Sequence, residues 1–349
     1  MTTLFDPLVA GNLPLSNRIV LAPLTRARAS EGRVPNDLML QYYVQRAGAG
    51  LIVSEATAIS PKAVGYEHTP GIWSEEQIEG WKRITEAVHA HGTRIVLQLW
   101  HVGRISDPSL LDGDLPVAPS AIAAAGNVSL LRPVRPFPTP RALDISEIPG
   151  IVEAYRQGAE NAKRAGFDGV EIHGANGYLL DQFLESSSNQ RTDAYGGSIE
   201  NRACLLLEVV DACISVWGAG SVGVHLSPRG GSNDIYDTDP AATFGSVAKE
   251  LGRRKIAFLF VREPPSADAL LPELKRAFGG VVIANQGLNA TSAQDVLDSG
   301  RADAVAFGLG FIANPDLPER IRRNAPWAEV NKATLYGRGP EGYTDYAAL

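Results

Sequence analysis

Two patterns of hydrophobic residues alternate along this chain. Short runs that are apolar at nearly every position predict buried strands, and longer stretches with an apolar residue every three or four positions predict helices that bury one face. The alternation repeats eight times. The predicted strands are Arg18–Leu24, Leu51–Thr57, Arg94–Trp100, Gly169–Ala175, Val222–Pro228, Ile256–Glu263, Val281–Gly287 and Ala304–Gly310.

The segment that follows the second predicted strand shows the helical pattern most clearly. Ser74 and Gln77 have the spacing of a capping box, in which each residue satisfies a free backbone N–H of the other. Gly92 is placed to end the helix. The apolar stripe between these two signals consists of Ile78, Trp81, Ile84, Thr85 and Val88.

Eight strand–helix units predict an α/β fold with a parallel sheet closed into a single (β/α)8, or TIM, barrel over residues 1–349. The alternative is an open doubly wound sheet, but no G-x-G-x-x-G follows the first strand. Three segments lie outside the units. Residues 1–17 are predicted to form a hairpin under the barrel, 101–145 with seven prolines to form a lid or insertion after strand three, and 325–349 to form a C-terminal tail.

Composition narrows the class of protein. The 349 residues are 44% hydrophobic and 20% charged, which excludes a disordered chain, a disulfide scaffold and a fibrous repeat. A net charge of −7 argues against a nucleic-acid or membrane partner. Cys204 and Cys213 lie on opposite faces of one predicted helix, so we expect no disulfide. We therefore expect a cytoplasmic protein without signal peptide or membrane span, whose oligomeric state the sequence leaves open.

In such a barrel the chemistry lies at the carboxyl ends of the strands. Three of the six histidines, His101, His173 and His225, end three consecutive predicted strands. Three histidines at one rim could hold a catalytic Zn²⁺. Since none of these three histidines belongs to an H-x-H pair and no partnering carboxylate is evident from the spacing, we favour separate roles and expect no metal.

The run from His173 to Tyr178 leaves the fourth predicted strand through Gly174 and Gly177. An imidazole N–H and the amide of Asn176 can donate to one substrate oxygen and stabilise negative charge there. The phenol of Tyr178 carries a transferable proton at neutral pH, so it can act as a general acid. The alternative is a packed turn in which the tyrosine hydroxyl is simply satisfied.

Several passages together resemble the old yellow enzyme family of FMN-dependent ene-reductases over nearly the whole chain. That resemblance implies an NAD(P)H oxidoreductase that reduces the activated C=C bond of an electron-poor alkene or enone. The passages are Leu4–Leu8, Ala22–Arg26, Thr69–Trp73, Gln98–His101, His173–Leu184, Asn189–Asp193, Tyr195–Ser198, Ile312–Asp316 and Gly342–Tyr346.

The resemblance also implies roles for individual residues. His173 and Asn176 would bind the carbonyl or nitro oxygen, and Tyr178 would protonate the α-carbon after hydride transfer to the β-carbon. Tyr66, Trp100 and Tyr336 would form walls of the substrate pocket. NADPH or NADH would reduce the flavin. The residues implied in cofactor binding are Pro23, Leu24, Thr25, which would lie near the flavin C4 carbonyl, Ala58, Gln98, Asn285, Gly287 and Gly308.

Two positions depart from the family pattern. His225 and Leu309 stand where the family carries arginines that support the flavin N1/C2 edge and the FMN phosphate. A charge-assisted hydrogen bond is worth about 1.5–3 kcal/mol, so losing one predicts FMN binding roughly 10- to 100-fold weaker. The alternative is a flavin-free paralogue that performs an isomerisation, elimination or cyclisation with the same His/Asn/Tyr site and His225 as a base. A catalytically silent binding protein is a third reading.

Overall fold

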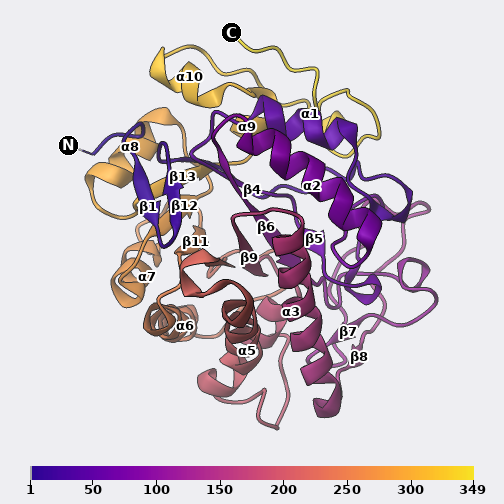
Figure 1. The fold of residues 1–349 in the computed structure, drawn as a ribbon. Helices are drawn as coiled ribbons and strands as arrows, with labels where there is room; N and C mark the ends of the chain where they lie inside the picture. Colours follow the sequence, from indigo (N-terminus) through magenta and orange to yellow (C-terminus); the bar gives the residue numbers. More distant parts are fainter. Residues whose placement is uncertain (1) are drawn as a thin grey trace.

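The computed structural model describes residues 2–349, in which eight parallel strands close into a barrel (Figure 1). Closure is made by β4, which pairs with β3 on one side and with β6 on the other. The predicted (β/α)8 fold is confirmed. Around the barrel the strands are β3 (Ile19–Leu21), β4 (Leu51–Val53), β6 (Arg94–Trp100), β9 (Gly169–Gly174), β10 (Val222–Leu226), β11 (Phe258–Arg262), β12 (Val282–Asn285) and β13 (Ala304–Phe307).

Helices form the outer layer around these strands (Figure 1). In α2 the predicted capping box of Ser74 and Gln77 is present, and the predicted stripe is buried. Gly92 follows the helix with a φ of 78°. The helices are α1 (Asp37–Gln45), α2 (Glu75–His89), α3 (Ile148–Arg164), α4 (Leu179–Leu184), α5 (Ile199–Trp217), α6 (Pro240–Arg254), α7 (Leu271–Phe278), α8 (Ala290–Asp298), α9 (Leu309–Ala313) and α10 (Leu317–Arg322).

Several strands are shorter than predicted, and the second is divided. The predicted strand Leu51–Thr57 ends at Val53, and a separate short strand, β5 (Thr57–Ala58), follows it. Side chains replace the ladder between them: Ser54 Oγ accepts from the N–H of Gln98 at 3.0 Å, and the N–H of Glu55 donates to the hydroxyl of Tyr43 at 2.8 Å. The hydrophobic pattern alone does not reveal where side-chain hydrogen bonds interrupt a strand, because the residues between β4 and β5 are still buried.

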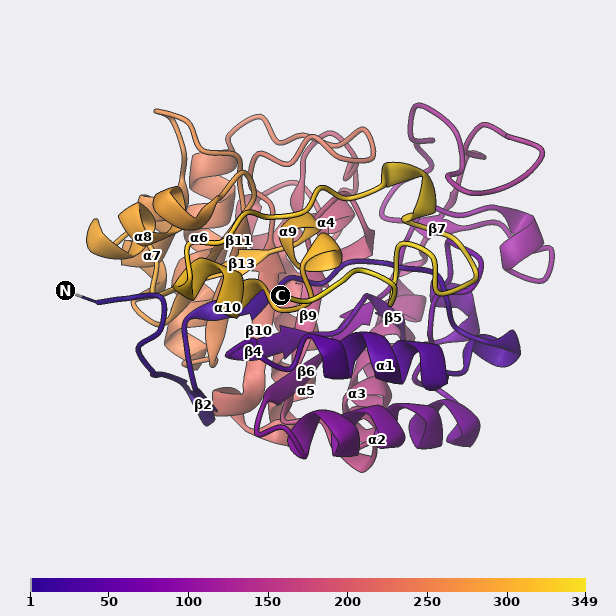
Figure 2. The same ribbon diagram turned by 90° about the horizontal axis from the view of Figure 1, so that it is seen from above.

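The N-terminal segment forms the predicted hairpin from β1 (Leu8–Ala10) and β2 (Leu13–Leu15). Figure 2 shows β2 at one end of the barrel and most of the long segment 101–145 at the other. The hairpin closes the floor, because its apolar side chains belong to the same cluster as those of the barrel interior. The cluster includes Ala10, Leu13, Leu15, Val20, Val53, Val96, Phe258, Phe260, Ile283 and Ala306.

Two segments cover the upper end of the barrel. Residues 101–145 carry only the short pair β7 (Val117–Ala118) and β8 (Arg141–Ala142) besides one 3₁₀ turn. The C-terminal tail is tied to the loop after β3, since the guanidinium of Arg28 donates to the backbone oxygens of Thr334, Leu335, Gly339 and Glu341. This anchor fixes the position of Tyr336, which lies within the tied stretch.

Cys204 and Cys213 both lie in α5 and are unpaired, as predicted. Within residues 2–349, no helix is both long enough and apolar enough to cross a bilayer.

Candidate active site

A cavity of about 330 Å³ opens at the carboxyl ends of the barrel strands. Most of the residues singled out from the sequence line it together, although they come from seven strand–loop units of the barrel and from the C-terminal tail. The predicted residues in its wall are Pro23, Leu24, Thr25, Tyr66, Gln98, Trp100, His173, Asn176, Tyr178, His225, Asn285, Gly308 and Tyr336.

Three predicted cofactor residues do not line this cavity. Ala58 is fully buried in β5, Gly287 lies beyond the end of β12, and Leu309 begins α9 with half of its surface exposed. Their roles stay predictions. The sequence did not point to five further lining residues, namely Ala22, Ala56, Ser129, Leu130 and Arg262.

The His173–Tyr178 turn carries three functional groups on a backbone that has two left-handed residues and is held by hydrogen bonds. Asn176 adopts a left-handed φ of 60° and Gly177 a φ of 74°. The N–H of Asn176 donates to Ser227 Oγ at 2.7 Å, and the N–H of Gly177 donates to Asp181 Oδ2 at 2.9 Å. A Cβ on Gly177 would lie 2.5 Å from the carbonyl oxygen of Ser232, so only glycine fits. The turn therefore brings imidazole, amide and phenol to one cavity wall.

Burial sets the protonation of these groups. It lowers the pKa of His173 to about 3, with a smaller contribution from the positive charge of Arg262, so the imidazole is neutral at pH 7. Burial also raises the pKa of Tyr178 above its ordinary value of 10, so the phenol keeps its proton. The hydroxyls of Tyr178 and Tyr66 share a hydrogen bond of 3.0 Å. The site thus contains a neutral donor and a protonated acid.

Aromatic rings form one side of the cavity. The rings of Tyr66 and Trp100 stack at a centroid distance of 5.6 Å, and Tyr178 meets Trp100 edge-on at 4.9 Å. His173 and His225 also stack, at 5.3 Å. His101 does not join them: its Nδ1 accepts the N–H of Gly103, and the residue lines another hollow. His101 therefore lies apart from His173 and His225, and the three histidines do not form one centre.

A buried polar cluster lies directly beneath. Gln98 Nε2 donates to Glu171 Oε2 at 2.5 Å and lies 3.3 Å from His225 Nδ1. The second oxygen of Glu171 has no hydrogen-bond partner in residues 2–349. Burial raises the pKa of Glu171 to about 8 and lowers that of His225 well below its ordinary value. Both groups are therefore uncharged near pH 7, although their nitrogen and oxygen are only 3.8 Å apart.

A family model places the chain among known proteins. The NADH:flavin oxidoreductase / NADH oxidase family matches residues 3–327. The chain belongs to this family. Morphinone reductase in complex with tetrahydroNAD is similar with a TM-score of 0.97 and 51% identity, covering 100% of this chain and 98% of that one. An old yellow enzyme homologue from Zymomonas mobilis is similar with a TM-score of 0.97 and 44% identity, covering 99% of this chain and 100% of that one.

A curated relative extends this likeness. A Leishmania infantum protein named "Probable flavin mononucleotide-dependent alkene reductase" is 43% identical over 355 residues, covering 98% of this chain and 96% of that protein. The resemblance inferred from sequence passages is thus confirmed, and the chain is an oxidoreductase of the old yellow enzyme type.

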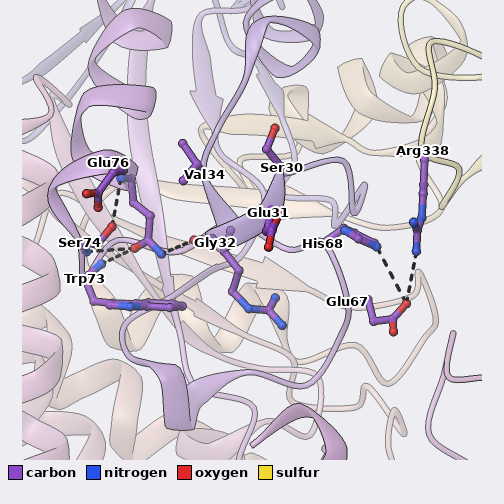
Figure 3. Close-up of a pocket in the computed structure, with 12 residues that line it drawn as sticks. Ser30, Glu31, Gly32, Val34, Glu67, His68, Trp73, Ser74, Glu76 and Arg338 are labelled. Carbon is purple, nitrogen blue, oxygen red and sulfur yellow. Dashed lines mark hydrogen bonds and ion pairs between the residues drawn. The ribbon is translucent and has the colours of Figure 1, made fainter. Parts of the chain in front are cut away.

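A second hollow in this old yellow enzyme homologue is wider, about 830 Å³, but shares no residue with the candidate active site. Figure 3 shows Glu67 between His68 and Arg338 on one side of this hollow, and the bonds around Ser74 on the other. Glu67 lies 4.0 Å from His68 and 3.8 Å from Arg338, and Gln77 donates to the carbonyl oxygen of Gly32. None of the residues that the sequence singled out for catalysis or cofactor binding lines this hollow, so we place the active site in the strand-end cavity.

Glu171 provides a stability test of the buried cluster. Its pKa is raised from 4.5 to about 8 on folding, so the folded protein binds the proton more tightly. The resulting stabilisation is complete below about pH 4.5 and is lost as the pH rises towards 8. Glu171→Gln removes this group, so the free energy of unfolding should fall less between pH 5 and pH 8 than in wild type. Urea unfolding of cofactor-free protein measures it.

The exposed Glu79→Gln is the matched control and should keep the wild-type slope. Other buried carboxyls with raised pKa, such as Glu55, contribute equally to all three proteins and cancel in the comparison. An unchanged slope in Glu171→Gln would contradict the assignment of a protonated Glu171.

Proposed function

We propose that this protein reduces the C=C bond of an electron-poor alkene such as an enone, with FMN as resident cofactor and NADH or NADPH as the reductant. The observation that carries the proposal is that His173, Asn176 and Tyr178 line one cavity with the residues implied in flavin binding. An enzyme that performs no redox chemistry would not need the residues implied in flavin binding.

The residues present fit a flavin. Three buried ring nitrogens at the cavity, Trp100 Nε1, His173 Nδ1 and His225 Nε2, have no hydrogen-bond partner in the described chain, so they remain available to ligands. The cavity volume is in the range of ordinary ligand pockets. When bound, FMN supplies the hydride. The cavity residues that would hold it are Pro23, Leu24, Thr25, Gln98, His225, Asn285 and Gly308.

The chain's own groups account for the remaining chemistry. An imidazole N–H of neutral His173 and the amide NH₂ of Asn176 donate to the substrate's carbonyl or nitro oxygen and stabilise the charge that develops there. The phenol of Tyr178 transfers its proton to the α-carbon. Tyr66, hydrogen-bonded to that phenol, can donate to the tyrosinate as it forms.

We place substrate selection in the two covering segments. Ser129 and Leu130 reach the cavity from the 101–145 insertion, and Tyr336 reaches it from the C-terminal tail. Neither segment supplies a barrel strand, so changes in the side chains that line the cavity from these segments leave the strand pairing intact. They are the lid and the wall of a single barrel domain.

We also place the protein in the cytoplasm, acting on small molecules rather than on nucleic acid. Its two cysteines are free thiols, which suits a reducing compartment. Its net charge of −7 opposes general binding to polyanions.

The decisive experiment is a visible spectrum of the purified protein with an FMN titration, followed by anaerobic addition of NADH and then 2-cyclohexenone. We expect a stoichiometric yellow cofactor, bleaching with NADH and recovery with the enone. A colourless protein that ignores FMN would overturn the proposal and favour the flavin-free alternative, which no observation in the structure supports.

Leu309→Arg tests the phosphate corner. Leu309 is an exposed apolar side chain at the start of α9, where the family pattern carries an arginine. Restoring the guanidinium should tighten FMN roughly 10- to 100-fold, the value of one charge-assisted hydrogen bond. Fluorescence quenching of FMN measures the dissociation constant. Leu115→Arg, at an equally exposed leucine outside the cavity, is the control and should leave it unchanged. Equal constants for the two variants would show that the phosphate lies elsewhere.

A further inference from the structure

Arg262 ends β11 and is the one formally charged side chain among the described residues that line the cavity. Its position follows from strand alternation, because Phe258 and Phe260 on the same strand already point into the barrel interior. His225 pairs with Phe260 across β10 and β11. Arg262 therefore sits one strand over and two residues above the position where the family pattern would place an arginine.

The guanidinium of Arg262 has neutral partners only. Its Nη1 donates to Asn176 Oδ1 at 2.5 Å and lies 3.3 Å from Ser232 Oγ. No carboxylate of residues 2–349 lies within 4 Å, and Nε and Nη2 make no hydrogen bond within the described chain. The nearby Arg229 differs, since it contacts Asp268 at 2.9 Å and Glu263 at 3.6 Å. Arg262 is thus a half-buried cation without a counter-charge.

The charge also acts on its neighbours. Asn176 has one acceptor and one donor end, and Arg262 occupies the acceptor. The amide NH₂ is then left for a ligand. Arg262 contributes, after burial, to the lowered pKa of both His173 and His225. Removing a cation from water without pairing it is costly, and a ligand carrying negative charge at this point repays that cost.

We infer that Arg262 is the anion-binding residue of the active cavity and the residue that orients Asn176. The inference rests on the proposed function. The negative charge has two possible sources of the same chemistry, a planar oxyanion edge: the reduced flavin ring, or a carboxylate on the alkene substrate.

The experiment compares wild type with Arg262→Gln, Arg262→Lys and the control Arg229→Gln, which removes an equal charge from an ion pair outside the cavity. One arm measures the FMN dissociation constant by fluorescence and the reduction potential by spectroelectrochemistry. The other measures KM for (E)-4-oxo-2-pentenoate and for its methyl ester, two enones with the same carbon skeleton of which the ester has a methyl group in place of the carboxylate charge.

We expect Arg262→Gln either to weaken FMN binding or to raise KM for the acid by about 10- to 100-fold. Arg262→Lys keeps the charge and should recover most of that loss. Weaker FMN binding with a lowered potential assigns the anion to the cofactor. A KM that rises for the acid and not for the ester assigns it to the substrate.

Two outcomes would overturn the inference. In the first, the FMN dissociation constant and the KM values of Arg262→Gln lie within threefold of those of Arg229→Gln. In the second, the lysine and glutamine variants lose equally, which would indicate that the shape of the side chain matters rather than its charge. Failure of wild type to bind FMN or to reduce the ester would instead overturn the proposed function.

Discussion

Replacing Tyr178 with phenylalanine should slow alkene reduction by about 10²- to 10⁴-fold, the usual contribution of a positioned general acid. The phenol lies on the cavity wall beside His173, at a ring-centroid distance of 5.2 Å. Its raised pKa keeps the proton in place at neutral pH. Phenylalanine preserves the ring that packs against Trp100 but removes the proton. The loss should therefore fall on kcat, with KM for 2-cyclohexenone changed little.

Tyr66→Phe is the matched control for this prediction, because it removes the other hydroxyl of the same hydrogen bond. The decrease in kcat should be smaller in Tyr66→Phe than in Tyr178→Phe, since Tyr178 keeps its own proton. Stopped-flow spectra of the bound flavin should show that both variants still accept electrons from NADH. Unchanged turnover in Tyr178→Phe would remove this residue from the mechanism.

The second large effect is expected at His173. His173→Ala should lower kcat/KM by about 10²- to 10³-fold, as the loss of one oxyanion donor does elsewhere. Its Nδ1 is buried and has no partner in residues 2–349, so the structure reserves that atom for a ligand. Steady-state rates with 2-cyclohexenone measure the loss.

His173→Gln provides the discriminating control, since a glutamine amide keeps an N–H donor at the same place. It should recover part of the activity that alanine loses. The imidazole is neutral because its pKa is lowered to about 3, so wild-type activity should show no transition near pH 6.5 from this group. Equal rates in wild type and His173→Ala would mean that the substrate oxygen binds elsewhere.

The fold was predictable because it follows from local pattern. Eight apolar runs separated by amphipathic stretches leave few architectures, and the Ser74–Gln77 capping box, the helix stripe and the N-terminal hairpin all appear as predicted. The strand boundaries were less predictable. The division after Val53 depends on the hydroxyl of Tyr43 and the side chain of Ser54, whose contacts are made across elements distant in sequence.

Much of the candidate site was also predictable, because the ends of parallel strands converge on one rim of a barrel. His173, Asn176 and Tyr178 share a single turn, so their proximity required no knowledge of the tertiary structure. Arg262 was not predicted, although it lies two residues after Phe260 and four after Phe258 and therefore faces the same side of the strand. Ser129 and Leu130 gave none, because they lie in a proline-rich segment without periodicity.

By itself the sequence determined the repeating units, the family and the turn that presents imidazole, amide and phenol, because each of these is written in neighbouring residues. Only the closed barrel decided the charge of those groups and their partners. The contact between Arg262 and Asn176 joins residues 86 apart, and burial shifts the pKa values of His173, Glu171 and His225. The reason is that desolvation depends on every strand surrounding a side chain, and no stretch of sequence contains that information.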